Sequence, residues 1–395
     1  MYAPTKPVKI KLKWMHAADT GSLSSEAGRR YIPVDPNANF ERHPKCYIPG
    51  GDVVLAAKIA PEAEDGLPKY QLFRVHKFLL SLRSPAFANL FADADAAAPN
   101  DAYDGVPLIE LHGDSPQDLA LLLNYIYEPE TFLAFRRFDP NAPITITGVA
   151  RLSDKYLLEP LRKRLVAHVV EEWPTTLRNW DIQQAEIEAI THTIFSVTTV
   201  DGDAIDGDQL LSDRIPEPVS AIVFAQEFGC PEILPAAFYR LLQIGFKAHW
   251  SHRESHPNPY RYSPLARWRL LDKDNLVKYV LGLHEAEDYA PPIRTFVSVD
   301  CRPSFWEGWE TDPQAACYLF VENMVNVLGK GRGGTAARDP LHWLKECMEH
   351  ERFPELLKKH PRGLCDECSA VFYDAVARER QRIWQELLPK WFQLQ

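Results

Sequence analysis

Hydrophobic positions between Gly51 and Val170 follow the spacing of strands and then that of helices. The apolar run within Asp52–Ala57 predicts a buried strand, Tyr70–Val75 predicts its hairpin partner, and Pro107–Leu111 predicts a third strand. Two short helices are predicted by apolar residues at helical spacing, Phe78, Leu79 and Leu82 in the first and Phe87, Leu90 and Phe91 in the second. Short strands and helices in this order predict a small α+β domain.

Further helices are predicted toward the end of this segment. Asp114-Ser115-Pro116 combines a capping residue with a first-turn proline, which predicts a helix start. That helix carries one apolar face, formed by Leu119, Leu122, Leu123 and Ile126. Thr147–Val170 predicts a longer amphipathic helix that is broken at Pro160. The stretches Pro61–Pro68 and Ala92–Gly105 are predicted to be loops.

The chain on either side of this domain has a different pattern. Alternation over Val8–Trp14 predicts one strand, and the polar stretch Asp35–Pro44 predicts irregular surface chain. After Trp173 the pattern predicts helices separated by prolines, at Val219–Glu227, Pro235–Trp250, Leu276–Glu287, Pro313–Leu328, Pro340–His350 and Cys365–Leu388. We therefore predict an N-terminal extension over 1–44, the α+β domain over 45–172, and mainly α-helical regions over 173–300 and 301–395.

Charge and composition exclude several classes of function. The chain has 44 Lys and Arg against 54 Asp and Glu, and a net charge of −10 makes it a poor non-specific binder of nucleic acid or anionic lipid. Its longest apolar run, Ala315–Val321, is far shorter than the roughly 20 residues that span a membrane. The first residues show no secretory signal, and seven cysteines form an odd number. We therefore expect a cytoplasmic and/or nuclear protein.

The order of motifs from Gly51 to about Val170 resembles a BTB/POZ domain. The residues that carry the resemblance are Asp52–Leu55, Phe73–Leu80, Ser84–Phe87, Leu90-Phe91, Ile109–Leu111, Leu119–Tyr127 and Val149–Leu161. The resemblance implies a small sheet flanked by helices, used for self-association or for docking onto a cullin-type ubiquitin-ligase scaffold. The sequence contains no catalytic or cofactor-binding signature, so we expect a non-enzymatic protein.

Three residues of this domain are candidates for an interaction site. In several BTB/POZ proteins an acidic residue at the position of Asp52 and a basic one at that of Lys77 form a charged pocket at the dimer interface. A desolvated pair of this kind contributes specificity more readily than stability. The alternative is that Asp52 and Lys77 are surface or capping charges, and that His76 is a structural, hydrogen-bonding histidine. Residues 20–49 contain no predicted amphipathic helix of the kind that dimeric members exchange, so self-association stays open.

Four residues near the C-terminus have the spacing of a zinc site. Cys347-x2-His350 and Cys365-x2-Cys368 could supply four ligands to one tetrahedral ion, since residues three apart share a face of a helix. The alternative is a set of buried thiols and no cofactor. Two weaker patterns, Gly329–Gly334 and Asp201–Asp208, depart from nucleotide and calcium motifs and predict a basic linker and an acidic loop.

The C-terminal half resembles fungal (basidiomycete-type) BTB proteins at Trp173-Pro174, Ile222–Pro231 and Leu364–Cys368. One stretch, Phe246–Leu270, has five basic residues against one acidic residue, together with several aromatic side chains. It could bind single-stranded nucleic acid, in a nuclear regulatory protein, or acidic peptides. The alternative is a solvated loop, or a patch that pairs with acidic residues of the same chain. Our main hypothesis is a protein-interaction protein that associates through its BTB-type domain; it could serve as a substrate adaptor for a cullin-type ligase, or in scaffolding or self-assembly.

Overall fold

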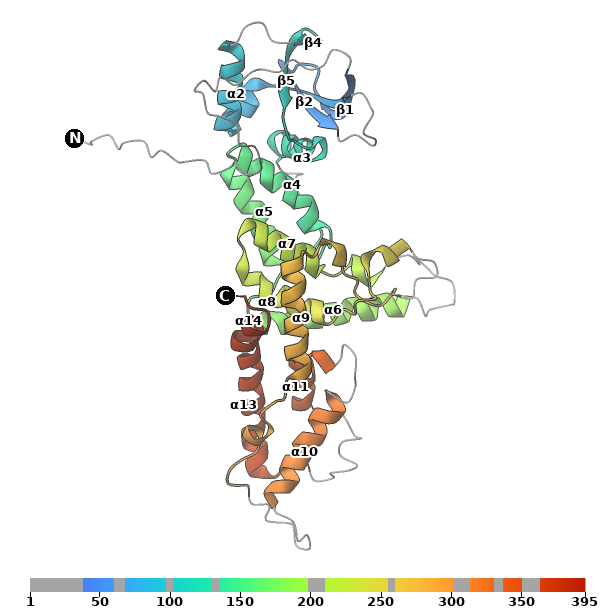
Figure 1. The fold of residues 1–395 in the computed structure, drawn as a ribbon, viewed down its shortest axis with the longest axis vertical. Helices are drawn as coiled ribbons and strands as arrows, with labels where there is room; N and C mark the ends of the chain where they lie inside the picture. Colours follow the sequence, from blue (N-terminus) through green and yellow to red (C-terminus); the bar gives the residue numbers. More distant parts are fainter. Residues whose placement is uncertain are drawn as a thin grey trace, which may run out of the picture.

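The computed structural model describes residues 38–59, 68–96, 102–129, 135–197, 210–254, 260–301, 313–329, 337–349 and 363–394. Within these ranges the chain forms an N-terminal α+β domain followed by a helical region, which confirms the predicted fold class (Figure 1). The strand predicted at Val8–Trp14 lies outside the described residues. None of the described helices is long and apolar enough to cross a membrane.

Five strands form the sheet of the N-terminal domain. They are β1 (Asn39–Tyr47), β2 (Val53–Ile59), β3 (Lys69–Val75), β4 (Ala102–Tyr103) and β5 (Val106–Leu111), and they lie in the order β1-β3-β2-β5-β4. β2 and β3 are antiparallel, with Val53 opposite Val75, whereas β1 runs parallel to β3 and β5 runs parallel to β2. The predicted hairpin and the predicted third strand are thereby confirmed.

β1 corrects the prediction of irregular chain over Asp35–Pro44. Asn39–Tyr47 runs along β3, so the sheet begins ahead of the predicted domain start at residue 45. β1 has a single neighbouring strand, and Cys46 is the one buried residue among its nine. An edge strand of this kind does not need a regular alternation of apolar side chains, which is why its polar sequence concealed it.

The sheet curls until its two edges meet. Arg42 of β1 donates a hydrogen bond to the Asp104 carboxylate, in the turn after β4, at 2.7 Å, and Tyr47 Oη donates to the same carboxylate at 2.6 Å. One face of the sheet carries a small apolar cluster, which consists of Val54, Ala56, Tyr70, Leu72 and Leu108. The alternate residues of β2, Val53 and Leu55, join the main core on the other face. Both faces are therefore apolar, which explains the unbroken apolar run of β2.

Three helices cover the main-core face of the sheet, and they are α1 (Lys77–Arg83), α2 (Pro85–Ala96) and α3 (Pro116–Tyr127). The prediction for α3 is confirmed, because the Ser115 side chain accepts the N–H of Asp118 and the whole predicted face is buried. The start of α2 is capped in the same way. Ser84 Oγ accepts the N–H of Phe87 at 3.0 Å, and Phe87 stacks on Phe91.

The predicted loop Ala92–Gly105 is wrong at both ends. α2 continues to Ala96, because alanine is the best helix former and this segment is rich in it. At the other end β4 and β5 form a hairpin whose two-residue turn is Asp104-Gly105, with φ of 47° and 76°. Two successive positive φ values are typical of a tight hairpin turn, and the Asp-Gly pair favours it.

Two helices close the domain, and further helices build the helical region. α4 (Ala142–Lys155) and α5 (Glu159–Glu171) are separated just ahead of Pro160, as predicted. The main helices that follow are α6 (Leu177–Val197), α7 (Pro218–Phe228), α8 (Leu234–Leu242), α9 (Lys273–Asp288), α10 (Pro313–Leu328), α11 (Pro340–Met348), α13 (Asp366–Arg382) and α14 (Leu388–Trp391), and the π-helix η9 (Ile383–Leu387) joins the last two. Of these helices only α6 has no counterpart in the predictions. The helix predicted over Pro235–Trp250 is shorter than expected, because α8 ends at Leu242.

α6 escaped prediction because its buried side chains are sparse. It is 21 residues long, yet its buried hydrophobic residues, Leu177, Trp180, Ile187 and Ile194, leave most turns with a polar or exposed surface. An amphipathic helix normally shows three or four apolar positions in every two turns. Tertiary contacts fix α6 instead, among them the Trp180 ring against Tyr239 of α8 and Trp384 of η9.

One apolar core runs from the N-terminal domain into the helical region without a break. It includes Val53 of the sheet, Val149 of α4, Phe224 of α7 and Phe372 of α13. The molecule is elongated, with the sheet at one end and α10 and the start of α13 at the other (Figure 1). Arg151 of α4 also forms an ion pair with Glu227 of α7.

Candidate interaction surface and thiol cluster

An exposed apolar pair lies on α1 of the N-terminal domain. Phe78 is 76% exposed and Leu82 is 66% exposed, and the two residues are one helical turn apart. The sequence predicted that both residues, with Leu79, form the buried face of this helix. The structure corrects that prediction, because Leu80 is the fully buried residue and Leu79 is half-buried. We refer to Phe78 and Leu82 as the α1 ridge.

The start of α1 is fixed on two sides. Asp52 Oδ1 accepts the backbone N–H of Lys77 at 2.7 Å, so this carboxylate caps the helix from the neighbouring strand. The backbone N–H of His76 donates to Tyr127 Oη at 2.8 Å, and His76 Nδ1 lies 3.0 Å from the same hydroxyl. The backbone at the start of α1, which carries the α1 ridge, is therefore fixed in position.

The structure brings the three predicted interaction residues together, but not as a pair of opposite side-chain charges. Asp52 meets the backbone of Lys77, and the Lys77 ammonium donates instead to Asp95 Oδ1 at 2.6 Å. Lys77 Nζ also lies 6.0 Å from the ring centre of Phe91. The backbone N–H and the Nδ1 atom of His76 both hydrogen-bond to the Tyr127 hydroxyl. The observed geometry matches the capping and structural alternatives for these residues within one chain.

The basic and aromatic stretch Phe246–Leu270 is largely engaged with the rest of the chain. Arg253 forms an ion pair with Asp213, and Arg267 is buried and paired with Glu217. Both guanidinium groups lie over the ring of Trp250, at 4.6 and 3.7 Å from its centre. Residues 255–259 lie outside the described part of the chain. The described contacts match the alternative in which this stretch pairs with acidic residues of the same protein.

An open depression of about 490 Å³ lies between α6 and α13. Its charged side chains include Asp181 and Arg380, and Arg380 Nη2 donates to Asp181 Oδ1 at 2.6 Å. Arg380 is 6% exposed and also donates to the backbone carbonyl of Leu341. These groups hold helices together and do not form a nucleophile with a general base.

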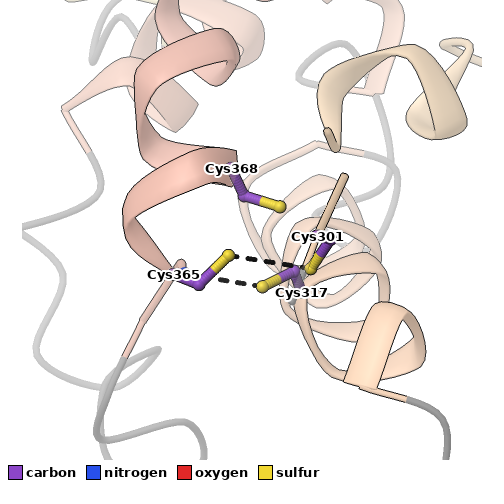
Figure 2. A group of neighbouring side chains, drawn as sticks. All are labelled: Cys301, Cys317, Cys365 and Cys368. Carbon is purple, nitrogen blue, oxygen red and sulfur yellow. Dashed lines mark hydrogen bonds between the residues drawn. The ribbon is translucent and has the colours of Figure 1, made fainter. Parts of the chain in front are cut away.

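Four of the seven cysteines lie together at the far end of the helical region (Figure 2). They are Cys301, Cys317, Cys365 and Cys368, and their Sγ atoms all lie within 4.8 Å of one another. Cys301 Sγ is 3.6 Å from Cys365 Sγ, and the backbone N–H of Cys365 donates to Cys317 Sγ at 3.5 Å. We call this group the thiol cluster. Among the described residues it is the one group of three or more His, Cys, Asp and Glu side chains placed to hold a metal ion.

Burial raises the pKa of three thiols in the cluster. It does so for Cys301 and Cys317, and it raises the pKa of Cys368 to about 12. Cysteines that act as nucleophiles or redox sensors have a lowered pKa and an accessible sulfur. The thiol cluster has the opposite properties and is not built for nucleophilic chemistry.

The predicted zinc ligands are only partly those that the structure assembles. Cys365 and Cys368 lie in the thiol cluster as the Cys-x2-Cys spacing predicts, but Cys347 of α11 is buried elsewhere and is not a member. His350 lies outside the described residues. Cys301 and Cys317 take the two remaining places, and sequence reasoning missed them because each is far from Cys365 along the chain. The Gly329–Gly334 and Asp201–Asp208 patterns also fall outside the described residues, except for Gly329.

Comparison with known proteins identifies the N-terminal domain. A family model of the BTB/POZ domain matches residues 61–172, which include β3, the helices α1 to α5 and the β4–β5 hairpin. Residues 61–172 are therefore a BTB/POZ domain, and the resemblance noted in the sequence is confirmed for this part of the chain. Domains of this family are generally protein-interaction modules. A search of curated proteins found no match to the chain.

Proposed function

We propose that the protein works by protein–protein association through its BTB/POZ domain, and that the α1 ridge is the contact surface between two copies. The observation that carries the proposal is the exposure of Phe78 and Leu82 on a helix whose start is fixed by Asp52 and Tyr127. An apolar side chain that leaves water contributes about 1.5–3 kcal/mol. Two such anchors from each copy are enough to centre an interface.

The second copy is the favoured occupant for two reasons. A pair of apolar residues one turn apart on a short helix can meet its own image across a two-fold axis. The α1 ridge also follows directly after Lys77, whose position belongs to the dimer-interface pocket in several proteins of this family. An interface of standard size covers about 800 Å² on each partner, so the α1 ridge would form its centre and neighbouring polar residues its rim.

Light scattering of the purified full chain at several concentrations tests this proposal. We expect the mass to rise toward twice that of the monomer as concentration increases, and we expect the double variant Phe78→Ser/Leu82→Ser to stay monomeric. At a concentration where the wild type is a monomer, the double variant should unfold at the same temperature as the wild type, because both side chains are exposed in the monomer. Ile144→Ser is the matched control, since Ile144 is a half-exposed apolar residue on α4 of the same domain. A wild-type monomer at all concentrations, or an unchanged dimer in the double variant, would refute self-association.

We further propose that the protein is a substrate adaptor for a cullin-type ubiquitin ligase. The support is the BTB/POZ domain at one end of an elongated chain and a helical region that extends away from it (Figure 1). Mixing the full chain with a purified cullin scaffold should give a complex that elutes as one species in gel filtration. A failure of this complex to form would remove the adaptor role and leave self-association as an independent proposal.

The remaining assignments are proposals of the same kind. We propose that the protein is non-enzymatic, belongs to the fungal (basidiomycete-type) group of BTB proteins and works in the cytoplasm, the nucleus or both. A nuclear regulatory role through Phe246–Leu270 has less support, because Arg253 and Arg267 already have partners in the chain. A mobility-shift assay at low salt with single-stranded nucleic acid tests that role, and retention of the probe would revive it.

A further inference from the structure

We propose that Cys301, Cys317, Cys365 and Cys368 form a structural zinc site that joins three segments of the helical region. Four thiolates arranged as a tetrahedron are a standard ligand set for a structural zinc ion. The closed set of four protein ligands leaves no open position for a substrate, so its role is to hold the chain together. This site is separate from the BTB/POZ domain, and the proposal does not depend on the α1 ridge.

The spacing of the sulfur atoms fits a single ion. With a zinc–sulfur distance of about 2.3 Å, the sulfur atoms of a tetrahedral site lie about 3.8 Å apart. The Sγ atoms of Cys301 and Cys365 are 3.6 Å apart, and no pair in the cluster exceeds 4.8 Å. Small side-chain rotations therefore suffice to close the cluster around one ion. An iron–sulfur cluster would insert several iron and sulfide atoms between the thiolates, and a separation below 4.8 Å does not accommodate it.

Three separate elements position the four ligands. Cys365 is the residue just ahead of α13, and Cys368 lies one turn on, so both sulfur atoms face the same side of the helix start. Cys317 comes from α10, and Cys301 comes from the chain that follows the short helix η5 (Ile293–Phe296). Figure 2 shows the four sulfur atoms pointing toward one another from these elements.

Backbone N–H groups already point at two of the four sulfur atoms. The backbone N–H of Cys365 donates to Cys317 Sγ, and a backbone hydrogen bond from Ser298 reaches Cys368. The start of α13 adds the positive end of a 17-residue helix beside Cys365 and Cys368. Hydrogen bonds of this kind to metal-bound sulfur orient the ligands and stabilise the bound ion.

The alternative roles of four neighbouring thiols fit less well. A reactive thiol needs an accessible sulfur, whereas Cys301, Cys317 and Cys368 are buried. A plain apolar core of cysteines explains burial, but it does not explain why four sulfur atoms from three elements converge on one point. Zinc explains both features.

Metal analysis of the purified full chain tests the proposal. We expect one equivalent of zinc per chain in the wild type, and loss of that zinc in Cys365→Ser and in Cys317→Ser. Cys347→Ser is the matched control, because Cys347 is a buried cysteine of the same region that lies outside the cluster, and this variant should keep its zinc. A folded wild type with no zinc, with iron in its place, or with full zinc in both cluster variants would overturn the proposal.

Two measurements protect the test from variants that fail to fold. Cobalt added to chelator-treated wild-type protein should give the visible bands of a tetrahedral cobalt–thiolate centre, and their absence would count against the site. Alkylation of the unfolded, chelated protein without reductant should modify all seven cysteines. If peptide mapping shows that two of the cluster thiols are joined in a disulfide and escape modification, a zinc site with four thiolates is refuted.

Discussion

Glu217 and Arg267 form a buried ion pair in the junction between the BTB/POZ domain and the helical region. The side chains of Arg267 and Glu217 are 9% and 1% exposed. Glu217 accepts the N–H groups of Val219 and Ser220 at the start of α7, and it also accepts the backbone N–H of Arg267 at 3.1 Å. The Arg267 guanidinium reaches Glu217 at 3.3 Å and donates to the carbonyl of Pro140, just ahead of α4, at 2.6 Å.

Glu217→Gln keeps the shape of this side chain and removes its charge. Breaking a buried pair by neutralising one partner costs about 3–5 kcal/mol, because the remaining charge stays out of water without compensation. The amide nitrogen of glutamine also faces an N–H group where the carboxylate offered an oxygen, and one hydrogen bond to a charged group is worth about 1.5–3 kcal/mol. We therefore expect the variant to lose about 3–5 kcal/mol in free energy of unfolding.

Urea unfolding followed by tryptophan fluorescence measures the loss. Trp250 is one of ten tryptophans that contribute to the signal, and Arg267 Cζ lies 3.7 Å from its ring centre. Asp374→Asn is the control with the same chemistry on the surface, because Asp374 and its partner Arg378 are 68% and 70% exposed. An exposed pair four residues apart on a helix contributes only about 0.3–0.5 kcal/mol.

Equal shifts of the unfolding midpoint in Glu217→Gln and Asp374→Asn would refute this reasoning. A second variant separates the charge from the hydrogen bonds. In Glu217→Gln/Arg267→Met the unpaired buried charge is gone, so we expect the double variant to recover part of the lost stability. If the double variant loses more free energy of unfolding than the two single variants lose together, the account is also contradicted.

Three further predictions concern other parts of the molecule. Gly282→Ala on α9 should destabilise the protein by about 1–3 kcal/mol, because the new Cβ would lie 2.0 Å from the ring of Phe392. In Gly245→Ala the new Cβ would meet no atom within 4 Å, so this control should melt at the wild-type temperature. Burial raises the pKa of Glu172 above its ordinary value of 4.5, so the ionisation of Glu172 costs stability as pH rises through the folded-state pKa. Glu172→Gln keeps an acceptor for the N–H of Phe138 and has no charge to bury. In a series of melting curves this variant should gain stability relative to wild type between pH 4 and 7. Chelation of zinc should lower the melting temperature and speed hydrogen exchange at the start of α13 more than in the BTB/POZ domain, and uniform exchange changes would contradict a local clamp.

The sequence predicts an element well when its side chains have a single role. α3 is the clearest case, because Ser115 caps it and its apolar face has one destination, the core. α1 shows the limit of this reasoning. Phe78 and Leu82 have the spacing of buried residues, and hydrophobicity alone does not distinguish a face that meets the core from one that meets solvent or a partner.

The remaining errors have physical causes of the same kind. β1 is an edge strand and α6 is fixed by a few aromatic contacts, so neither carries the periodic signal of its element. For the thiol cluster, the Cys365-x2-Cys368 spacing is local and visible in the sequence. Its partners Cys301 and Cys317 are chosen by how η5, α10 and α13 pack, and a single sequence does not contain that information.

The unbroken core that joins the sheet to the helical region has a mechanical consequence. Bending the molecule between these parts would expose apolar surface around α4 and α7 to water, and each 100 Å² exposed costs about 2.5 kcal/mol. A partner held at the sheet and another held beside α10 would therefore be kept at a nearly constant separation and orientation (Figure 1). The fold therefore sets the distance between the sheet and α10.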